Sequence, residues 1–217
     1  MILTESISHN YRPPIVWIFL FWTIACGIVF VSLGNLPLRD FDEATVARVA
    51  LELNQKSGLE RFLPSIWDKP YLNKPPGLHW IISFGIGISQ NFQNRFDLLP
   101  SEFCIRFFPA FFYTFVVPLG GLIQWNLRPK DRLACITTSA ILLTLLPIIR
   151  YGRMAMLDGS QLSAIALLWL CLSSIKKNRS TKFNFLGAGF ACSFMLLLKA
   201  PVIIPALFAS LVPLIWE

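Results

Sequence analysis

The apolar run IVWIFLFWTIACGIVFVSL, from Ile15 to Leu33, decides the fold class of this chain. As a helix it measures about 28 Å, close to the roughly 30 Å hydrocarbon core of a bilayer. It is too long for the core of a signal peptide and has no small-residue cleavage site, so it predicts an uncleaved transmembrane helix. The composition agrees, because 55% hydrophobic residues, 14% charged residues and a mean hydropathy of +0.60 exclude an ordinary soluble domain.

Further apolar runs predict further transmembrane helices. They cover residues 103–125, 133–149, 162–175, 183–198 and 202–216. The predicted fold is therefore an all-α membrane protein with about six transmembrane helices. Its expected parts are a tail (1–14), the first helix (15–33), a long loop with amphipathic and membrane-lying helices (34–101), and transmembrane helices 2 to 6 (102–217).

Basic loops predict the orientation. Residues 126–132 hold three cations and one anion, and residues 176–182 hold four cations. The positive-inside rule places both loops and the tail in the cytoplasm, and loop 34–101 outside the cytoplasmic (inner) membrane. This requires that the apolar piece 78–89, about 18 Å long as a helix, lies along the membrane surface or re-enters. Much of the net charge of +7 lies in these loops, so it does not indicate a nucleic-acid partner.

The cysteines and histidines predict no metal or disulfide site. The five cysteines are far apart and form no C-x-x-C pair. The two histidines have no second ligand at metal spacing. No residue is therefore assigned to a metal.

Three acids lie at the start of the outer loop, in the stretch RDFDE from Arg39 to Glu43. Residues 40–54 predict an amphipathic helix, because apolar residues recur at i, i+3, i+4 and i+7. Asp40 with Glu43 three residues later resembles a capping box. Asp42 is not needed for capping and is the stronger candidate for a general base, with Glu43 as a second candidate catalytic acid. The alternative is that these acids only stabilise the helix start.

The motif YLNKPPG, residues 71–77, places Lys74 directly before two prolines. A lysine fixed at the level of the lipid headgroups suits a phosphate, which it contacts as a point charge with three donors. The alternative is an interfacial lysine that extends its ammonium group to water.

The segment RYGRMAMLD, residues 150–158, lies on the outer side by the parity of the spans. Arg150 and Arg153 run against the positive-inside bias there, so we expect a phosphate ligand or Asp158 to balance them. Asp158 precedes an apolar span, where a charge is costly and usually functional, unless it caps the helix. Lys199, also outside by parity, is either a second phosphate contact or an end-of-helix charge.

Together, the motifs RDFDE, NKPPG, RMAMLD and LKAP resemble the N-terminal half of polyprenyl-phosphate-sugar glycosyltransferases of the GT-C fold. That family includes protein O-mannosyltransferases and lipid A aminoarabinose transferases. The resemblance implies transfer of a sugar from an undecaprenyl-type phosphate, outside the membrane and with inversion at the anomeric carbon. It also implies that Asp42 and Asp158 are catalytic acids and that Lys74 holds the lipid phosphate, and Lys199 matches a lysine that follows the fifth span in the family.

The implied partners are a polyprenyl-phosphate-linked sugar, a lipid, glycan or protein acceptor, and membrane lipids. A divalent metal is the one cofactor left open, and Asn73 replaces the Glu through which some relatives contact it. Relatives are longer, so the C-terminal part of the family is expected to be absent here. The chain is then either a glycosyltransferase module, its remaining spans supplied by a second chain, or a truncated, non-catalytic subunit that binds polyprenyl phosphate. A transporter is disfavoured, because the predicted spans carry almost no charge.

Overall fold

A computed structural model of the chain describes residues 12–39, 41–93, 100–176 and 181–215. Its helices are α1 (Ile15–Phe30), α2 (Asp42–Gln55), η1 (Gly58–Phe62), α3 (Gly77–Gln93), α4 (Glu102–Thr114), α5 (Val116–Leu127), α6 (Arg132–Thr144), α7 (Leu146–Gly152), α8 (Leu157–Lys176), α9 (Thr181–Lys199), η2 (Ala200–Val202) and α10 (Ile203–Ile215). In the described part of the chain, the only strands are β1 (Ser65–Ile66) and β2 (Lys69–Pro70), which pair as an antiparallel hairpin. The predicted all-helical membrane fold is confirmed.

Every predicted span contains a helix, but some of the spans are divided into two helices and do not form a single one. The second span is α4 and α5, separated at Phe115, and the third is α6 followed by the short α7. Three segments are long and apolar enough to cross a membrane, namely Glu102–Leu127, Leu157–Ile175 and Lys182–Leu211. Helices α1 and α6 are apolar but shorter. The segment from Lys182 is itself interrupted at Lys199, whose φ of −159° and ψ of 83° are not helical.

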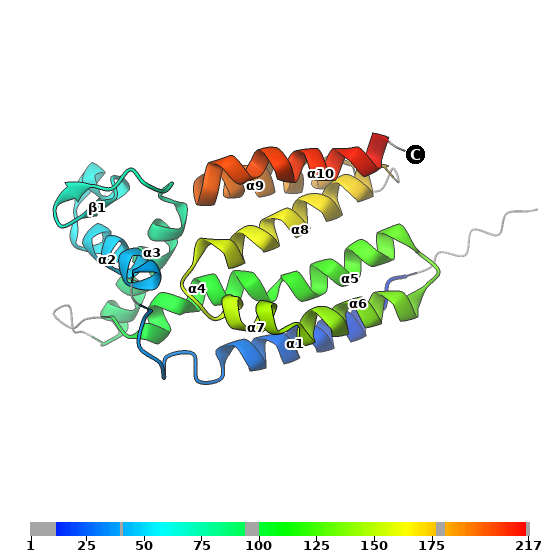
Figure 1. Cartoon of the computed structure of the whole chain (residues 1–217), viewed down its shortest axis with the longest axis horizontal. Helices are drawn as coiled ribbons and strands as arrows, with labels where there is room; N and C mark the ends of the chain where they lie inside the picture. Colours follow the sequence, from blue (N-terminus) through cyan, green and yellow to red (C-terminus); the bar gives the residue numbers. More distant parts are fainter. Residues whose placement is uncertain (1–11, 40, 94–99, 177–180, 216–217) are drawn as a thin grey trace, which may run out of the picture.

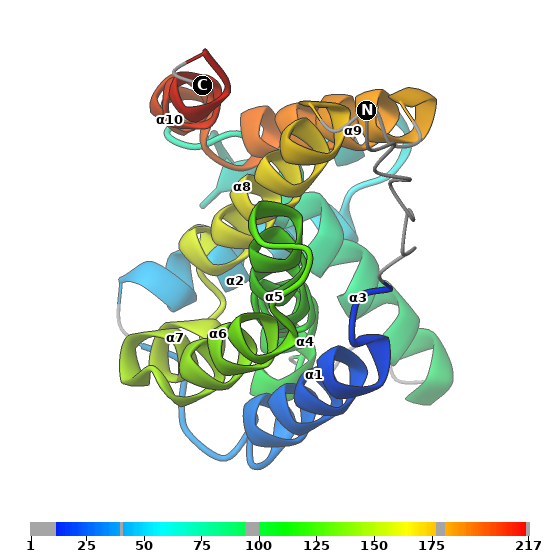
Figure 2. The same cartoon turned by 90° about the vertical axis from the view of Figure 1, so that its right-hand side faces the viewer.

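The helices form a bundle with a smaller lobe at one end (Figure 1). Helices α1, α4, α5, α6, α8, α9 and α10 run along the long axis, whereas α2, α3 and the hairpin make up the lobe. Helix α3 extends beyond the predicted apolar piece 78–89 and runs across the long axis in both views (Figures 1 and 2). The lobe thus comes from the predicted outer loop.

One hydrophobic core joins the lobe to the bundle. Val46 and Ala50 of α2 pack with Leu78 and Ile82 of α3. The same cluster includes Ile105 of α4, Ala155 and Leu157 at the start of α8, and Leu198 at the end of α9. Because these side chains are buried together, α2 is held against the start of α8 and the end of α9.

The α5–α6 connection lies at the opposite end of the bundle from the lobe (Figure 1). It carries Arg128, Lys130 and Arg132, which are exposed. The end of α8 and the start of α9 lie at that same end (Figure 1). The basic segments are therefore separated from the lobe by the length of the bundle.

Candidate active site

A cavity of about 250 Å³ lies where α2, the link before α3, α8 and the α9–η2 turn meet. Its lining is Asp42, Val46, Asn73, Lys74, Pro75, Met156, Leu157, Asp158, Lys199 and Pro201. Four of the residues predicted from the sequence therefore share one cavity, although their positions span most of the chain. Two carboxylates and two ammonium groups meet there.

Asp158 and Lys199 form an ion pair at this cavity. The Lys199 ammonium nitrogen lies 3.2 Å from an Asp158 carboxylate oxygen, and it donates a hydrogen bond to it. The two side chains are 61% and 50% exposed, so the pair is screened by water and stabilises the fold by about 0–1 kcal/mol at most. A ligand can open this pair at little energetic cost.

Lys74 is held near Lys199 by the residues that follow it. A Cβ added at Gly77 would lie 2.7 Å from both the Cβ and the carbonyl oxygen of Leu197. This approach is too close for any larger residue without movement of the backbone. The NKPPG motif is thus packed directly on the end of α9, with Pro75 and Pro76 restricting the backbone between Lys74 and the contact.

Asp42 is the first residue of α2, and its side chain is exposed toward the cavity. Phe41 is the N-cap, with φ 73° and ψ −61° and no side-chain capping bond. That conformation is rare and strained for a non-glycine residue. The predicted capping box falls partly on Asp40, which lies outside the described residues, and the predicted helix start at residue 40 shifts to 42.

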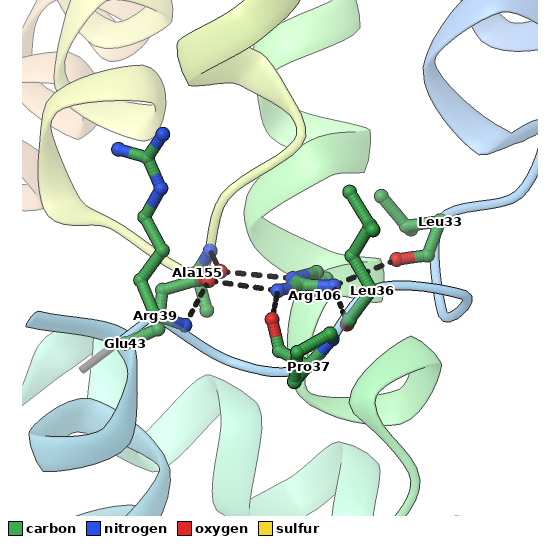
Figure 3. Close-up of polar contacts among 7 residues, drawn as sticks. All are labelled: Leu33, Leu36, Pro37, Arg39, Glu43, Arg106 and Ala155. Carbon is green, nitrogen blue, oxygen red and sulfur yellow. Dashed lines mark hydrogen bonds and ion pairs between the residues drawn. The ribbon is translucent and has the colours of Figure 1, made fainter.

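Glu43 does not line the cavity and lies in a buried network with Arg106 of α4 (Figure 3). The Arg106 Nε and Nη2 donate to the two carboxylate oxygens at 2.9 and 2.8 Å. Glu43 also accepts the backbone N–H groups of Arg39 and Ala155, at 2.9 and 2.7 Å. Every lone-pair direction of this carboxylate is therefore engaged, which makes Glu43 a structural centre of the site.

Arg106 directs its remaining donors at the link between α1 and α2 (Figure 3). Its Nη1 donates to the carbonyl oxygens of Leu33 and Leu36 at 3.0 and 2.7 Å, and its Nη2 to that of Pro37 at 2.9 Å. Arg106 and Glu43 are 5% and 0% exposed. One buried ion pair thus joins the α1–α2 link, α4 and the α7–α8 link.

Burial of Glu43 acts to raise the pKa of its carboxyl group. The Arg106 guanidinium and the N–H groups of Ala155 and Arg39 act in the opposite direction and prevail, so the pKa of Glu43 lies below its ordinary value. Glu43 is therefore ionised at neutral pH and is unsuited to accept a proton there.

The family model for dolichyl-phosphate-mannose-protein mannosyltransferases matches residues 75–217. The chain belongs to this family. The predicted resemblance to polyprenyl-phosphate-sugar glycosyltransferases is thereby confirmed, and the protein is a member of a family of membrane glycosyltransferases. Neither a comparison with curated proteins nor one with solved structures returned a match. Arg106, Asp158 and Lys199 lie inside the matched region, whereas Asp42 and Lys74 precede it.

Two predicted phosphate ligands of this mannosyltransferase-family chain lie elsewhere. Arg153 does not line the cavity, and its Nη2 donates to the Val31 carbonyl oxygen at the end of α1. Arg150 is exposed in the last turn of α7 and is also absent from the cavity lining. The structure therefore brings together the two lysines and not the two arginines.

Arg106 was missed by sequence reasoning. It stands in the aromatic run EFCIRFFPAFF, residues 102–112, which predicts a membrane span. An ionisable residue inside such a run is costly and marks a function or a buried partner, so this lone arginine was the available signal. The expectation that the spans carry almost no charge overlooked it.

Within the described residues, no three His, Cys, Asp or Glu side chains cluster as metal ligands. At the cavity, the oxygen-bearing side chains are those of Asp42, Asp158 and Asn73. Two carboxylates and an amide have the chemistry that Mg²⁺ accepts.

Proposed function

We propose that the protein transfers a sugar from a polyprenyl-phosphate donor to an acceptor hydroxyl at the lobe end of the bundle. The observation that carries this proposal is the cavity that gathers Asp42, Lys74, Asp158 and Lys199. Membership of a mannosyltransferase family supports mannose as the first sugar to test and a protein hydroxyl as the first acceptor. Lipid and glycan acceptors come next.

Each charged group has a role in this reaction. The acceptor oxygen forms a bond to the anomeric carbon while the bond from that carbon to the phosphate oxygen breaks. Asp42 takes the acceptor proton as general base, and the electron pair leaves with the polyprenyl phosphate. Lys74 and Lys199 stabilise the charge that grows on the phosphate. With base and cations on opposite faces of the sugar, the configuration at the anomeric carbon inverts.

We assign Glu43 and Arg106 as positioning residues. Glu43 follows Asp42 in α2, and its carboxylate accepts the Ala155 N–H three residues before Asp158. The pair therefore sets the separation between the two acids that line the cavity. Arg153 also helps to position Asp158, because it fixes the α7–α8 link to the end of α1. Asp158 orients Lys199 and faces the acceptor side.

The test is transfer from defined polyprenyl-phosphate sugars by purified protein in liposomes. Asp42→Asn should lower turnover by about 10²–10⁴-fold, the usual contribution of a general base. Asp68→Asn is the matched control, since this exposed acid of the hairpin turn lies outside the cavity and its φ of 60° suits asparagine. Undiminished turnover of the Asp42 variant would refute the role. Donor binding without transfer by the wild type would favour a non-catalytic lipid-binding subunit.

A further inference from the structure

A second cavity lies on the lobe, between the end of α2, η1 and the outer face of α3. Its volume is about 360 Å³. Arg61 and Phe62 of η1 form one side, and Trp80, Phe84 and Ile88 of α3 form the other. It shares no lining residue with the cavity of Asp42 and Lys74. It is therefore a separate site, which we call the lobe groove.

The lobe groove exposes large apolar side chains. Phe62 and Phe84 are 60% and 66% exposed, and neighbouring Leu59 and Leu63 are 84% and 66% exposed. Trp80 holds η1 in place through two contacts with Phe62. Its indole N–H donates to the Phe62 carbonyl oxygen at 3.3 Å, and the two rings meet edge-on with their centroids 6.0 Å apart. Such a patch on a preformed scaffold marks a binding surface for apolar material.

Arg61 is the one charged residue that lines the lobe groove. Among the described residues it forms no ion pair. The remaining polar groups of the lining are uncharged and include Ser83 and Asn91. The groove therefore complements a ligand with one negative charge and an apolar body.

The apolar side of the groove continues onto a membrane-crossing helix. The rings of Phe84 on α3 and Phe108 on α4 lie 6.5 Å apart, and a Cβ added at Gly85 would lie 2.7 Å from the Phe108 ring. Helix α4 belongs to the segment Glu102–Leu127, which is long and apolar enough to cross a bilayer. Surrounding lipid can therefore reach the groove laterally along α4.

We propose that the lobe groove binds an anionic phospholipid of the surrounding bilayer. The headgroup phosphate contacts the Arg61 guanidinium, with Ser83 and Asn91 facing the glycerol and headgroup hydroxyls. The first part of an acyl chain lies over Trp80 and Phe84. Aromatic and basic side chains commonly anchor proteins at this depth of the membrane. The bound lipid fixes the lobe, and with it the outer end of the active site, at the bilayer surface.

Native mass spectrometry of the full chain, released from nanodiscs of phosphatidylglycerol and phosphatidylcholine, tests this proposal. The wild type should retain one phosphatidylglycerol in preference to phosphatidylcholine. Arg61→Gln should weaken that retention about fivefold, the usual effect of one cation near an anionic membrane. Lys69→Gln is the matched control, because Lys69 is an exposed cation of the same lobe that does not line the groove. Unchanged thermal unfolding of both variants establishes that they are folded.

Two results would overturn the proposal. One is equal retention of both lipids by the wild type, or equal phosphatidylglycerol retention by wild type and Arg61→Gln. The other is displacement of phosphatidylglycerol by equimolar polyprenyl phosphate together with a raised donor KM in Arg61→Gln. That second pattern would make the groove part of the donor site. Phe84→Ala gives an independent check, since it should also reduce retention without a change of charge.

Discussion

All five N–H groups of the buried Arg106 donate hydrogen bonds to Glu43 and to the α1–α2 link, so the site geometry depends on this residue. It pairs bidentately with Glu43 and also holds three carbonyl oxygens of the α1–α2 link. Lysine cannot reproduce this, because its ammonium is a point charge without a planar fork. Removal of either partner leaves the other charge buried and unpaired.

Glu43→Gln and Arg106→Gln should each destabilise the protein by about 3–5 kcal/mol, the usual cost of removing one partner of a buried ion pair. Thermal unfolding in detergent measures this, with Glu60→Gln as control because Glu60 is exposed on η1. A positioning role predicts more than lost stability. In variants that remain folded, turnover should fall while the donor KM changes little. If both constants stay at wild-type values, the pair only holds the fold together.

Stability should also fall at acidic pH because of Glu43. Its pKa is lowered in the folded state from an ordinary value of 4.5. The folded protein therefore binds fewer protons than the unfolded chain. The stabilisation from ionised Glu43 is complete above pH 4.5 and is lost as the pH falls through the pKa of Glu43 in the folded state. Unfolding temperatures recorded from pH 7 to pH 3 should decline at the acidic end. Glu43→Gln should show a shallower decline, and an equal slope would contradict this assignment.

Lys74 is the cation of the NKPPG motif that lines the cavity. Lys74→Ala should raise the donor KM and also lower turnover at saturating donor, because the ammonium group both binds the donor phosphate and stabilises the charge that grows on it. Lys69→Ala, which removes an exposed cation outside the cavity, is the control in the same transfer assay. Equal donor KM values in the two variants would remove Lys74 from the donor site.

The link before α3 and the end of α9 act as one packed unit. Gly77→Ala should cost about 1–3 kcal/mol, since the new methyl group overlaps Leu197. It should also raise the donor KM, because it moves Lys74 away from Lys199. Gly27→Ala in α1 is the control, because nothing lies within 4 Å of its added Cβ. That variant should be neutral or slightly stabilising, as alanine favours helices.

The hairpin shows why parts of the lobe could not be predicted. Trp67 and Asp68 both have positive φ, as tight hairpin turns require, yet the turn has neither Gly nor Asn to signal it. The turn is held by the buried Glu52, which accepts from the Ser65 hydroxyl at 2.7 Å and the Trp67 N–H at 2.8 Å. A contact between residues so far apart leaves no local pattern in the sequence.

Over the whole chain, hydropathy predicted the helices well because membrane spans are set by composition and length. The parity of the spans predicted one membrane face for Asp42, Lys74, Asp158 and Lys199, but it did not predict that these four residues share a cavity. The burial of Glu43 could not be predicted from the sequence, since its partner Arg106 lies 63 positions away. The exclusion of Arg150 and Arg153 from the cavity could not be predicted either, because side-chain direction depends on tertiary packing.

The membrane orientation can be tested by labelling. Ser57→Cys in the lobe and Arg128→Cys in the α5–α6 connection are exposed positions at opposite ends of the molecule. A membrane-impermeant maleimide added to intact cells should label the first and spare the second, by the positive-inside rule. The wild type measures background from the native cysteines. Labelling of both positions, or of Arg128→Cys alone, would refute the orientation.

The ion pair of Asp158 and Lys199 has a consequence for the order of events during turnover. A donor phosphate that arrives at Lys199 competes with Asp158 for the same ammonium group. Asp158 is then released only after the donor is in place, and its free carboxylate can meet the acceptor. On the proposed function, substrates therefore enter sequentially, donor before acceptor. An acceptor that comes first meets a carboxylate that is still paired with Lys199, and it therefore binds weakly until the donor has arrived.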